Sequence, residues 1–242
     1  MTTAAWYLLK TQAPWAKWFN VIHWPYTLFH LSYVVIGACL AKELNLPLLG
    51  WTLLAFFLGM GIGAHCYDLV KGDPLKLGLH PGTLIIVGFL ALAGAVGIGL
   101  WQVWLDNVSL YLVVASAVGL ILATGYGLEW KGLHGNWQFA AWWAGFPLIV
   151  SYLAQGLAFT PVLIPVLIFA LASATAQRVL STRARYLRRL VGKAKVELWS
   201  LDGDYYLESK DSLLKPLDTT LAWLSLAMVA LAGGLLAWRL MM

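Results

Sequence analysis

The sequence predicts an all-α integral membrane protein with about seven transmembrane helices. Its hydrophobic fraction is 61% and its charged fraction is 11%. Soluble domains carry about 25% charged residues, so this chain has too few charges to cover itself with a polar surface. The apolar runs are continuous rather than alternating, which favours helices over a transmembrane β-barrel. We therefore expect a single membrane domain over residues 1–242, surrounded by membrane lipids.

Charge-free runs give the positions of the expected helices. A helix needs ~20 apolar residues to cross the ~30 Å hydrocarbon core of a bilayer. The run at 132–177 is long enough for two crossings, and Gly156 and Pro161 favour a turn between them. The predicted spans are 20–41, 46–68, 80–104, 107–128, 137–156, 161–178 and 219–239.

Basic residues predict the orientation of these spans. Lys and Arg gather before the first span and after the second, fourth and sixth spans, which share one side in a protein with seven spans. The loops of the other side carry few charges. Because cytoplasmic loops hold the excess of Lys and Arg, we expect a cytoplasmic N-terminus and an outside C-terminus. The expected location is the plasma membrane of a bacterium or an archaeon.

The segment 179–217 is the one long stretch that is expected to face water. It begins with several arginines and continues with KVELWSLDGDYYLES, in which two alternating runs flank Asp202 and Gly203. This pattern predicts a small cytoplasmic β-hairpin between the sixth and seventh helices. The arginines have two interpretations. They either anchor the segment to anionic headgroups or grip a diphosphate.

The end of the second span, GAHCYDLVKGDPLKLGLH, is the richest cluster of ionisable residues. His65 and Asp68 are three residues apart and share one helix face, and Lys71 and Asp73 follow in the loop. Ionisable groups at membrane depth are costly, which indicates a function. Asp68 and Asp73 would hold Mg²⁺, the metal would bridge to a diphosphate, and Lys71 would add charge. The alternative is an ordinary helix end that meets water.

Three further residues are candidates for binding. His30 lies deep in the first span, where it is either a haem, pigment or substrate contact or an imidazole satisfied by a neighbouring helix. Tyr126 and Lys131 belong to the region between the fourth and fifth spans, for which a plain interfacial loop is the alternative. Nucleotide-binding glycine loops, zinc spacings and basic nucleic-acid stripes are absent from the sequence, so we expect no nucleic-acid partner.

Four stretches resemble the UbiA-type prenyltransferase superfamily. WPYTLFHLSYVVIGACLA resembles its first helix, and GIGAHCYDLVKGDPL sits where that superfamily carries Asn-x-x-x-Asp-x-x-x-Asp. GYGLEWKGLHGNWQFAAWWAGFPLIVSYLAQG resembles its fourth-to-fifth helix stretch, and SATAQRVLSTRARYLRRLVG falls at its second aspartate motif. The resemblance covers the first six expected helices. It implies transfer of a prenyl group from a polyprenyl diphosphate to a hydrophobic acceptor, with magnesium held by both motifs.

The chain departs from this pattern at both motifs. Asp68 matches the middle aspartate, but Ala64 and Gly72 stand at the two outer positions, and Asp73 comes one residue late. The second motif has no acidic residue, and seven expected spans compare with nine in the superfamily. A UbiA-like site would have a catalytic group of Asp68, His65 and Asp73, with substrate contacts from Lys71, Tyr126, Lys131, Arg178 and Arg183. His30 is a further candidate substrate contact because of its depth in the first span.

Two functions follow as expectations. The first is a divergent UbiA-like membrane transferase or lipid-diphosphate-binding protein whose site faces the cytoplasm. In it, Arg178 and Arg183 would contact phosphate directly in place of a second metal. The second is a non-catalytic accessory or structural subunit of a membrane complex, with haem or a pigment bound through His30.

Overall fold

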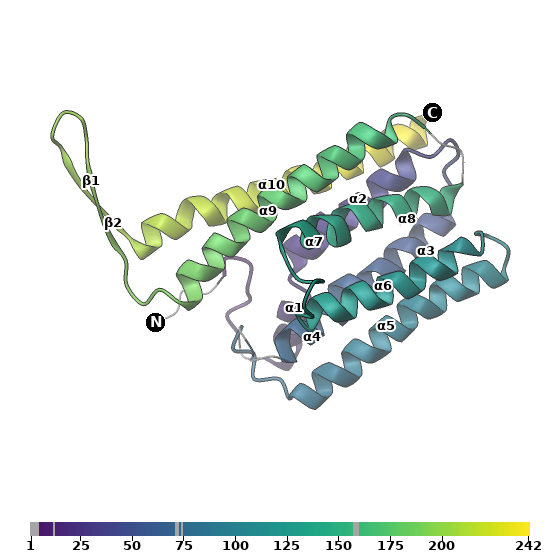
Figure 1. The fold of residues 1–242 in the computed structure, drawn as a ribbon, viewed down its shortest axis with the longest axis horizontal. Helices are drawn as coiled ribbons and strands as arrows, with labels where there is room; N and C mark the ends of the chain where they lie inside the picture. Colours follow the sequence, from purple (N-terminus) through teal and green to yellow (C-terminus); the bar gives the residue numbers. More distant parts are fainter. Residues whose placement is uncertain (1–4, 12, 71–72, 74, 157–159) are drawn as a thin grey trace.

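The computed structural model describes residues 5–11, 13–70, 73, 75–156 and 160–242, and this part is mostly helical (Figure 1). In chain order the elements are α1 (Pro14–Val21), α2 (Trp24–Cys39), α3 (Leu46–Phe56), the π-helix η1 (Phe57–Ala64), α4 (His65–Val70), α5 (Pro81–Trp104), α6 (Tyr111–Gly127), α7 (Asn136–Ala140), the π-helix η2 (Ala141–Gly145), α8 (Phe146–Gln155), α9 (Leu163–Arg189), β1 (Lys195–Trp199), β2 (Tyr205–Ser209) and α10 (Lys210–Met241).

Four helical units of the described chain are long and apolar enough to cross a membrane. They are Leu46–Val70, Pro81–Trp104, Leu163–Arg189 and Lys210–Met241. Large apolar side chains stay exposed along them, and Phe89 on α5 is 62% exposed. Such surface is unfavourable in water and favourable in lipid. The prediction of a mostly helical chain is thus confirmed, and four helices have the length and composition of membrane spans, whereas seven spans stay a prediction.

The other three predicted spans are also helical, but they are shorter or interrupted. The stretch at 20–41 contains the last two residues of α1 and the whole of α2, and His23 between them has a left-handed backbone with a φ of 50°. The stretch at 107–128 contains α6, and the stretch at 137–156 contains α7, η2 and α8 in direct succession.

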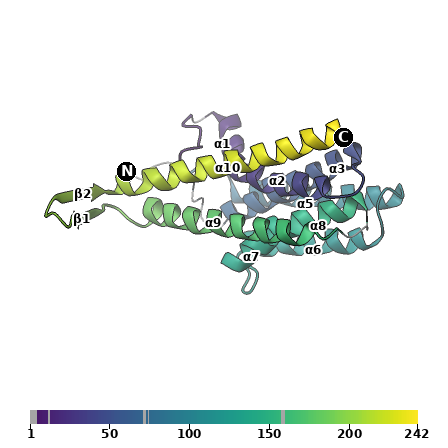
Figure 2. The same cartoon turned by 90° about the horizontal axis from the view of Figure 1, so that it is seen from above.

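The long helices lie side by side along one direction, and the hairpin extends beyond them (Figure 2). α2 packs against α8 and α10, α9 packs against α10 and α7, and α5 packs against η1 and α6. At the far end of the bundle, the Arg239 guanidinium donates to the carbonyl oxygens of Ala41 and Lys42, at 3.0 and 3.1 Å. These bonds join the end of α10 to the loop after α2.

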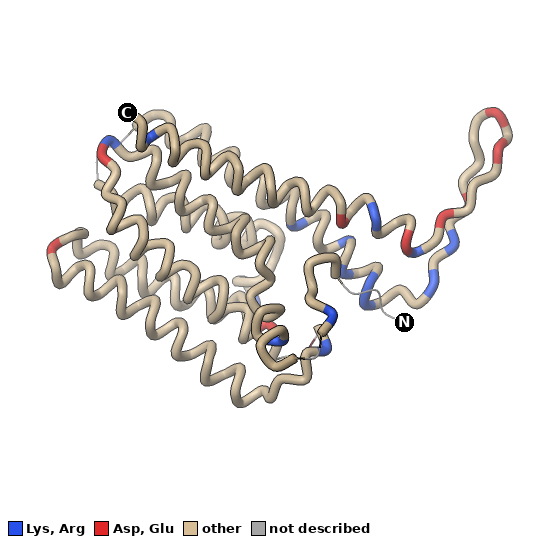
Figure 3. Tube along the Cα trace, turned by 180° about the vertical axis from the view of Figure 1, so that it is seen from behind, with Lys and Arg blue, Asp and Glu red and all other residues tan. Residues whose placement is uncertain are grey.

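The two ends of the bundle differ in charge. Lys and Arg gather around the second half of α9, the start of α10 and the N-terminal segment, whereas the end near the C-terminus carries few charges (Figure 3). The basic residues that predicted one polar side therefore lie at one end of the molecule.

The predicted hairpin is confirmed. β1 and β2 are antiparallel, with Lys195 opposite Ser209 and Trp199 opposite Tyr205. The helices on both sides are longer than the sequence indicated, since α9 runs on to Arg189 and α10 begins at Lys210. Strong helix formers continue α9 past residue 178. A capping box of Ser209 and Ser212 starts α10. The arginines of the 179–217 segment therefore lie on a continuous helix.

Gly37 allows α2 and α8 to approach closely. A Cβ atom at this position would collide with the backbone carbonyl of Leu148. Across the same interface, the Ser151 hydroxyl donates to the Val34 carbonyl at 2.7 Å. This contact holds together the part of the bundle on which the polar end is built.

We predict that Gly37→Ala forces α2 and α8 apart and lowers stability by about 1–3 kcal/mol, the usual cost of overpacking. Thermal unfolding in detergent measures the change. Gly50→Ala on α3 is the matched control, because nothing lies within 4 Å of its added Cβ. Equal melting temperatures for the two variants would contradict the close approach.

Candidate functional site

A cavity of about 620 Å³ opens among the helices at the basic end of the molecule. We call it the basic cavity. Seven basic side chains line it, and two carboxylates oppose them. The basic residues are Lys10, Lys17, Lys76, Arg178, Arg185, Arg188 and Arg189, and the acidic ones are Asp68 and Asp73. A cleft lined mostly by one sign of charge attracts ligands of the other sign. The basic cavity is therefore suited to an anion.

One face of α9 supplies the arginines of the cavity. Arg178, Arg185 and Arg188 are spaced by seven and three residues, so they share a helix face. Arg183 is five residues after Arg178, which turns it by about 140° around the helix. Its guanidinium lies over the Tyr186 ring at 5.5 Å, and Arg183 does not line the cavity. Helical spacing within the arginine series would have identified Arg185 and Arg188 and set Arg183 aside.

Arg178 is a buried cation with neutral partners. It is 8% exposed. Its Nη2 donates to Nε2 of His134 at 3.3 Å, and its Nε donates to Oδ1 of Asn136 at 3.4 Å. The guanidinium also lies over the Phe139 ring, 5.1 Å from the centroid. Within the described chain it forms an ion pair with no carboxylate. Asp68 and Glu129 act on it only through space. Burying a charge without a directly bonded counter-charge is costly, and an anionic ligand would offset that cost.

His134 and Tyr126 hold Arg178 in place. Nδ1 of His134 donates to the Tyr126 carbonyl at 3.2 Å. Because a carbonyl only accepts, Nδ1 carries the proton and Nε2 accepts from Arg178. The two rings stack at 4.5 Å. The Tyr126 hydroxyl is buried in the cavity wall, without a hydrogen-bond partner among the described residues. Lys131, predicted from the same region, is exposed and does not line the cavity.

α4 and the start of α2 carry the acid–base groups of the opposite wall. Asp68 is half-buried there and accepts no hydrogen bond from the described residues. Nδ1 of His65 donates to the Gly61 carbonyl at 3.1 Å, and its ring meets His23 edge-on at 4.5 Å. His23 has a strained left-handed backbone, and its Nδ1 is buried without a described partner. The sequence pattern identified His65 and Asp68, and the structure places both in the cavity.

Asp73 lines the cavity, but it also holds its own loop. Its Oδ1 accepts from the Leu77 N–H at 2.8 Å, and its Oδ2 accepts from the Gly78 N–H at 2.7 Å. Both carboxylate oxygens are thus engaged in ordering the chain after α4. Lys71, predicted as a neighbouring charge, lies outside the described residues.

The magnesium ion expected from the aspartate motif lacks a suitable set of ligands. Mg²⁺ requires near-octahedral coordination by oxygen. Every Asp, Glu, His and Cys of the chain falls within the described ranges, and no three of them gather where they could hold an ion. Because Asp73 is engaged with its loop, Asp68 stands as a single carboxylate. These residues do not fit a magnesium ion held by the protein alone, and Asp68 is the one carboxylate of the motif that is not engaged with its loop.

His30 lies at the inner end of the basic cavity and is 6% exposed. Its Nδ1 donates to the Trp143 carbonyl at 2.9 Å. The Phe29 and Phe139 rings meet it edge-on, at 5.3 and 5.2 Å. A neighbouring helical segment therefore satisfies one ring nitrogen, which was one of the two interpretations of this residue. Haem or pigment binding through His30 stays a prediction.

The N-terminal segment adds a residue that the sequence did not single out. Tyr7 lines the basic cavity, and its ring meets Tyr26 edge-on at 5.3 Å. Burial raises the pKa of the Tyr7 hydroxyl above its ordinary value, so this group stays neutral and able to donate at physiological pH. No pattern around Tyr7 marks it, because its position depends on tertiary packing.

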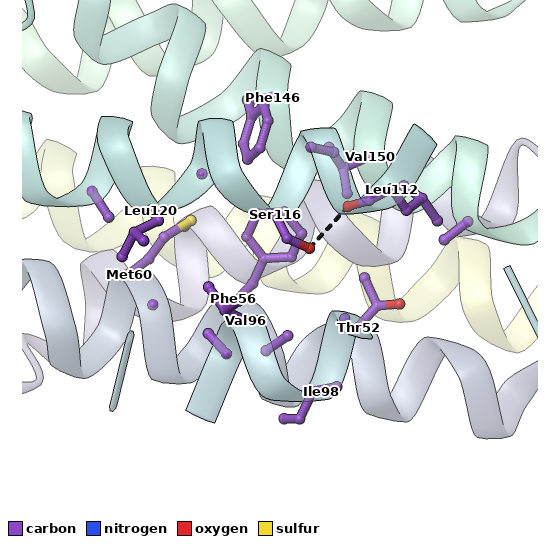
Figure 4. A pocket seen from close by; sticks show the side chains of 18 of the residues that line it. Thr52, Phe56, Met60, Val96, Ile98, Leu112, Ser116, Leu120, Phe146 and Val150 are labelled. Carbon is purple, nitrogen blue, oxygen red and sulfur yellow. Dashed lines mark hydrogen bonds between the residues drawn. The ribbon is translucent and has the colours of Figure 1, made fainter. Parts of the chain in front are cut away.

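A second, apolar pocket lies between α3, η1, α5, α6, η2 and α8 (Figure 4). Its volume is about 140 Å³. Phe56, Phe146 and Val150 are among its lining residues, and the Ser116 hydroxyl donates to the Leu112 carbonyl at 2.9 Å, so the wall presents mainly carbon. We call this space the apolar pocket.

Met60 and Trp143 line both the basic cavity and the apolar pocket. The two spaces therefore meet at a common wall, formed by η1 and η2. One side of this wall is rich in cationic groups and the other is apolar. This arrangement matches a ligand with a charged head and a hydrocarbon tail.

Comparison with protein-family models, with curated proteins and with solved structures gave no match. A functional assignment therefore rests on the geometry of the two spaces and on the chemistry of their walls.

We predict that a cysteine at position 181 reports the positive potential of the cavity. In a chain with Cys39 and Cys66 replaced by Ala, Ser181→Cys should react faster with an anionic methanethiosulfonate reagent than with a cationic one, because Ser181 lies beside the arginines of α9. The rate ratio should shrink as salt is added. Ser225→Cys, buried on α10 away from the cavity, is the unreactive control. A faster reaction with the cationic reagent would contradict the assignment.

Proposed function

We propose that the chain is a UbiA-like membrane transferase that binds an isoprenoid or related lipid diphosphate. The diphosphate would occupy the basic cavity, and the hydrocarbon chain would extend past Met60 and Trp143 into the apolar pocket. The common wall of the two spaces is the observation that carries this proposal. A water-soluble anion would leave the apolar pocket without a role, and a neutral lipid would leave the arginines without one.

The head of the ligand is assigned from the donors of the cavity. Guanidinium groups form strong, directional hydrogen bonds to phosphate oxygens. Arg178 and Arg185 supply such groups from α9, and Tyr7 adds a neutral hydroxyl from the N-terminal segment. Two linked phosphates would use this spread of donors more fully than one carboxylate.

The reaction that this site supports is prenyl transfer. The bond between the prenyl carbon and the diphosphate oxygen breaks, and its electron pair leaves with the diphosphate. Cationic groups around the leaving group stabilise that developing charge. The acceptor, arriving from the membrane, forms the new bond to the prenyl carbon and loses a proton. Asp68 and His65 are the nearby groups able to accept that proton.

The proposal includes seven spans, with the basic cavity open to the cytoplasm. Four helical units meet the length and hydropathy of a span, and the shorter helical stretches of α2, α6 and α7–η2–α8 lie beside them in the bundle. Seven crossings place the N-terminal segment and the hairpin on the cytoplasmic side, as the distribution of Lys and Arg favours.

We predict that Asp68→Asn retains the lipid diphosphate but loses transfer, because it removes a proton acceptor and keeps the side-chain shape. The rate should fall about 10²–10⁴-fold, the usual contribution of a positioned general base. The measurement is diphosphate release from geranylgeranyl diphosphate by purified protein, with a membrane lipid extract as the source of acceptor. Asp106→Asn, in an exposed turn at the opposite end, should match the wild type.

Two results would refute this proposal. One is wild-type turnover in Asp68→Asn. The other is purified protein that binds no geranylgeranyl diphosphate and carries a visible absorbance band that disappears in His30→Ala. That second result would favour the haem- or pigment-binding accessory subunit.

We also predict the sidedness of the chain. In a Cys39→Ala, Cys66→Ala background, Asp106→Cys should react with a membrane-impermeant maleimide on intact cells. Asp202→Cys, at the exposed tip of the hairpin, should react only after permeabilisation. The opposite pattern would reverse the orientation, and reaction of both on intact cells would contradict an odd number of spans between them.

A further inference from the structure

The basic cavity combines a surplus of cations with a shortage of metal ligands. We infer that it holds the diphosphate of its ligand by direct contact with guanidinium and hydroxyl groups, without a divalent cation. This inference rests on the proposed function and specifies how the same site recognises its ligand. It also sets the chain apart from what its resemblance to the UbiA-type superfamily implies.

The charges of the cavity provide the first support. Seven basic side chains line it, and one of them, Arg188, forms an ion pair with Asp218 on α10. Only Asp68 and Asp73 oppose them. A magnesium ion that bridges to phosphate is usually held by one or two carboxylates, and of the two here Asp73 is already engaged with its own loop. Basic side chains outnumber carboxylates in this cavity, which favours direct contact with phosphate rather than contact through a metal ion.

Arg178 provides the second support, through its unused donors. A guanidinium has five N–H donors. Among the described residues two of them are used, one on Asn136 and one on His134. These bonds and the Phe139 ring fix the plane of the group before any ligand arrives. A buried, oriented fork with free donors is the geometry of bidentate phosphate recognition.

The Tyr126 hydroxyl provides a third, independent observation. Tyr126 is 8% exposed, and its hydroxyl has no described hydrogen-bond partner although it lines the cavity. Unpaired buried donors are costly and call for an occupant. The Arg178 guanidinium lies 5.9 Å from the centroid of the same ring. Tyr126 and Arg178 therefore belong to the same part of the cavity wall.

The two modes of binding predict opposite effects at Asp68. With a bridging metal, Asp68 holds the ion, and Asp68→Asn weakens binding. With direct contact, Asp68 repels the diphosphate, and Asp68→Asn leaves binding unchanged or strengthens it. Both effects concern binding alone, so they are separate from the loss of turnover expected for this variant.

The experiment measures binding of radiolabelled geranylgeranyl diphosphate to the purified full-length chain by scintillation proximity, once with EDTA and once with excess magnesium chloride. Inorganic pyrophosphate is the competitor that separates head recognition from tail recognition. We expect equal affinity in the two buffers, competition by pyrophosphate in both, and equal or tighter binding by Asp68→Asn. Arg178→Gln should weaken binding at least tenfold, whereas Arg183→Gln, on the same helix but outside the cavity, should not.

Each contrary result has a distinct meaning. Binding that requires magnesium and weakens in Asp68→Asn overturns the inference and leaves the proposed function standing. Absence of binding in both buffers overturns both. If Arg178→Gln fails to fold, as judged by thermal unfolding, the comparison of buffers and the sign of the Asp68→Asn effect still decide.

Discussion

The arrangement of the polar end depends on one buried guanidinium. Arg178 lies in a largely apolar bundle, where an isolated charge is expensive, and its neighbours are an imidazole, an amide and aromatic rings. The surrounding structure holds this guanidinium in position. The turn between α6 and α7 brings His134 back to the Tyr126 carbonyl, which fixes the tautomer that can accept from Arg178. Arg178 lines the basic cavity, and no carboxylate of the described residues forms an ion pair with it there.

The two π-helical segments lie at the centre of the molecule, where the basic cavity meets the apolar pocket. η1 contributes Met60 to the common wall and directly precedes His65, and η2 contributes Trp143, whose carbonyl binds His30. A π-helical turn shifts the face that a helix presents, and such turns are frequent at functional sites. The polar and apolar spaces are thus joined by segments whose backbone departs from the regular helix.

The sequence predicted the class of the protein better than the details of its site. Long apolar runs and the Asp202–Gly203 turn are local signals, and the helices and hairpin follow from them. The end of the second span identified His65 and Asp68 for the same reason. The role of Asp73 was not readable, because its carboxylate bonds to the backbone N–H groups of its own loop, a contact that residue spacing does not reveal.

The spacing of the α9 arginines in the sequence was enough to predict which of them face the cavity. A helical period separates the cavity-facing set from Arg183, and that period applies because the helix continues past the expected end of the span. In contrast, the packing of Tyr7 over the cavity joins segments that no periodic pattern connects. Residues brought in by tertiary packing alone lie beyond what spacing within one helix can identify.

The wall shared by Met60 and Trp143 has a consequence for permeability. The basic cavity opens at one end of the bundle, and residues of the apolar pocket extend toward the other end. A water-filled channel that joined the two spaces would conduct ions and protons. The Met60 thioether and the Trp143 indole lie at that junction, and both residues are 7% exposed. Methionine is also flexible enough to yield to a hydrocarbon chain. If a lipid tail passes these two side chains as proposed, they would also block the leakage of ions and protons when the site is empty.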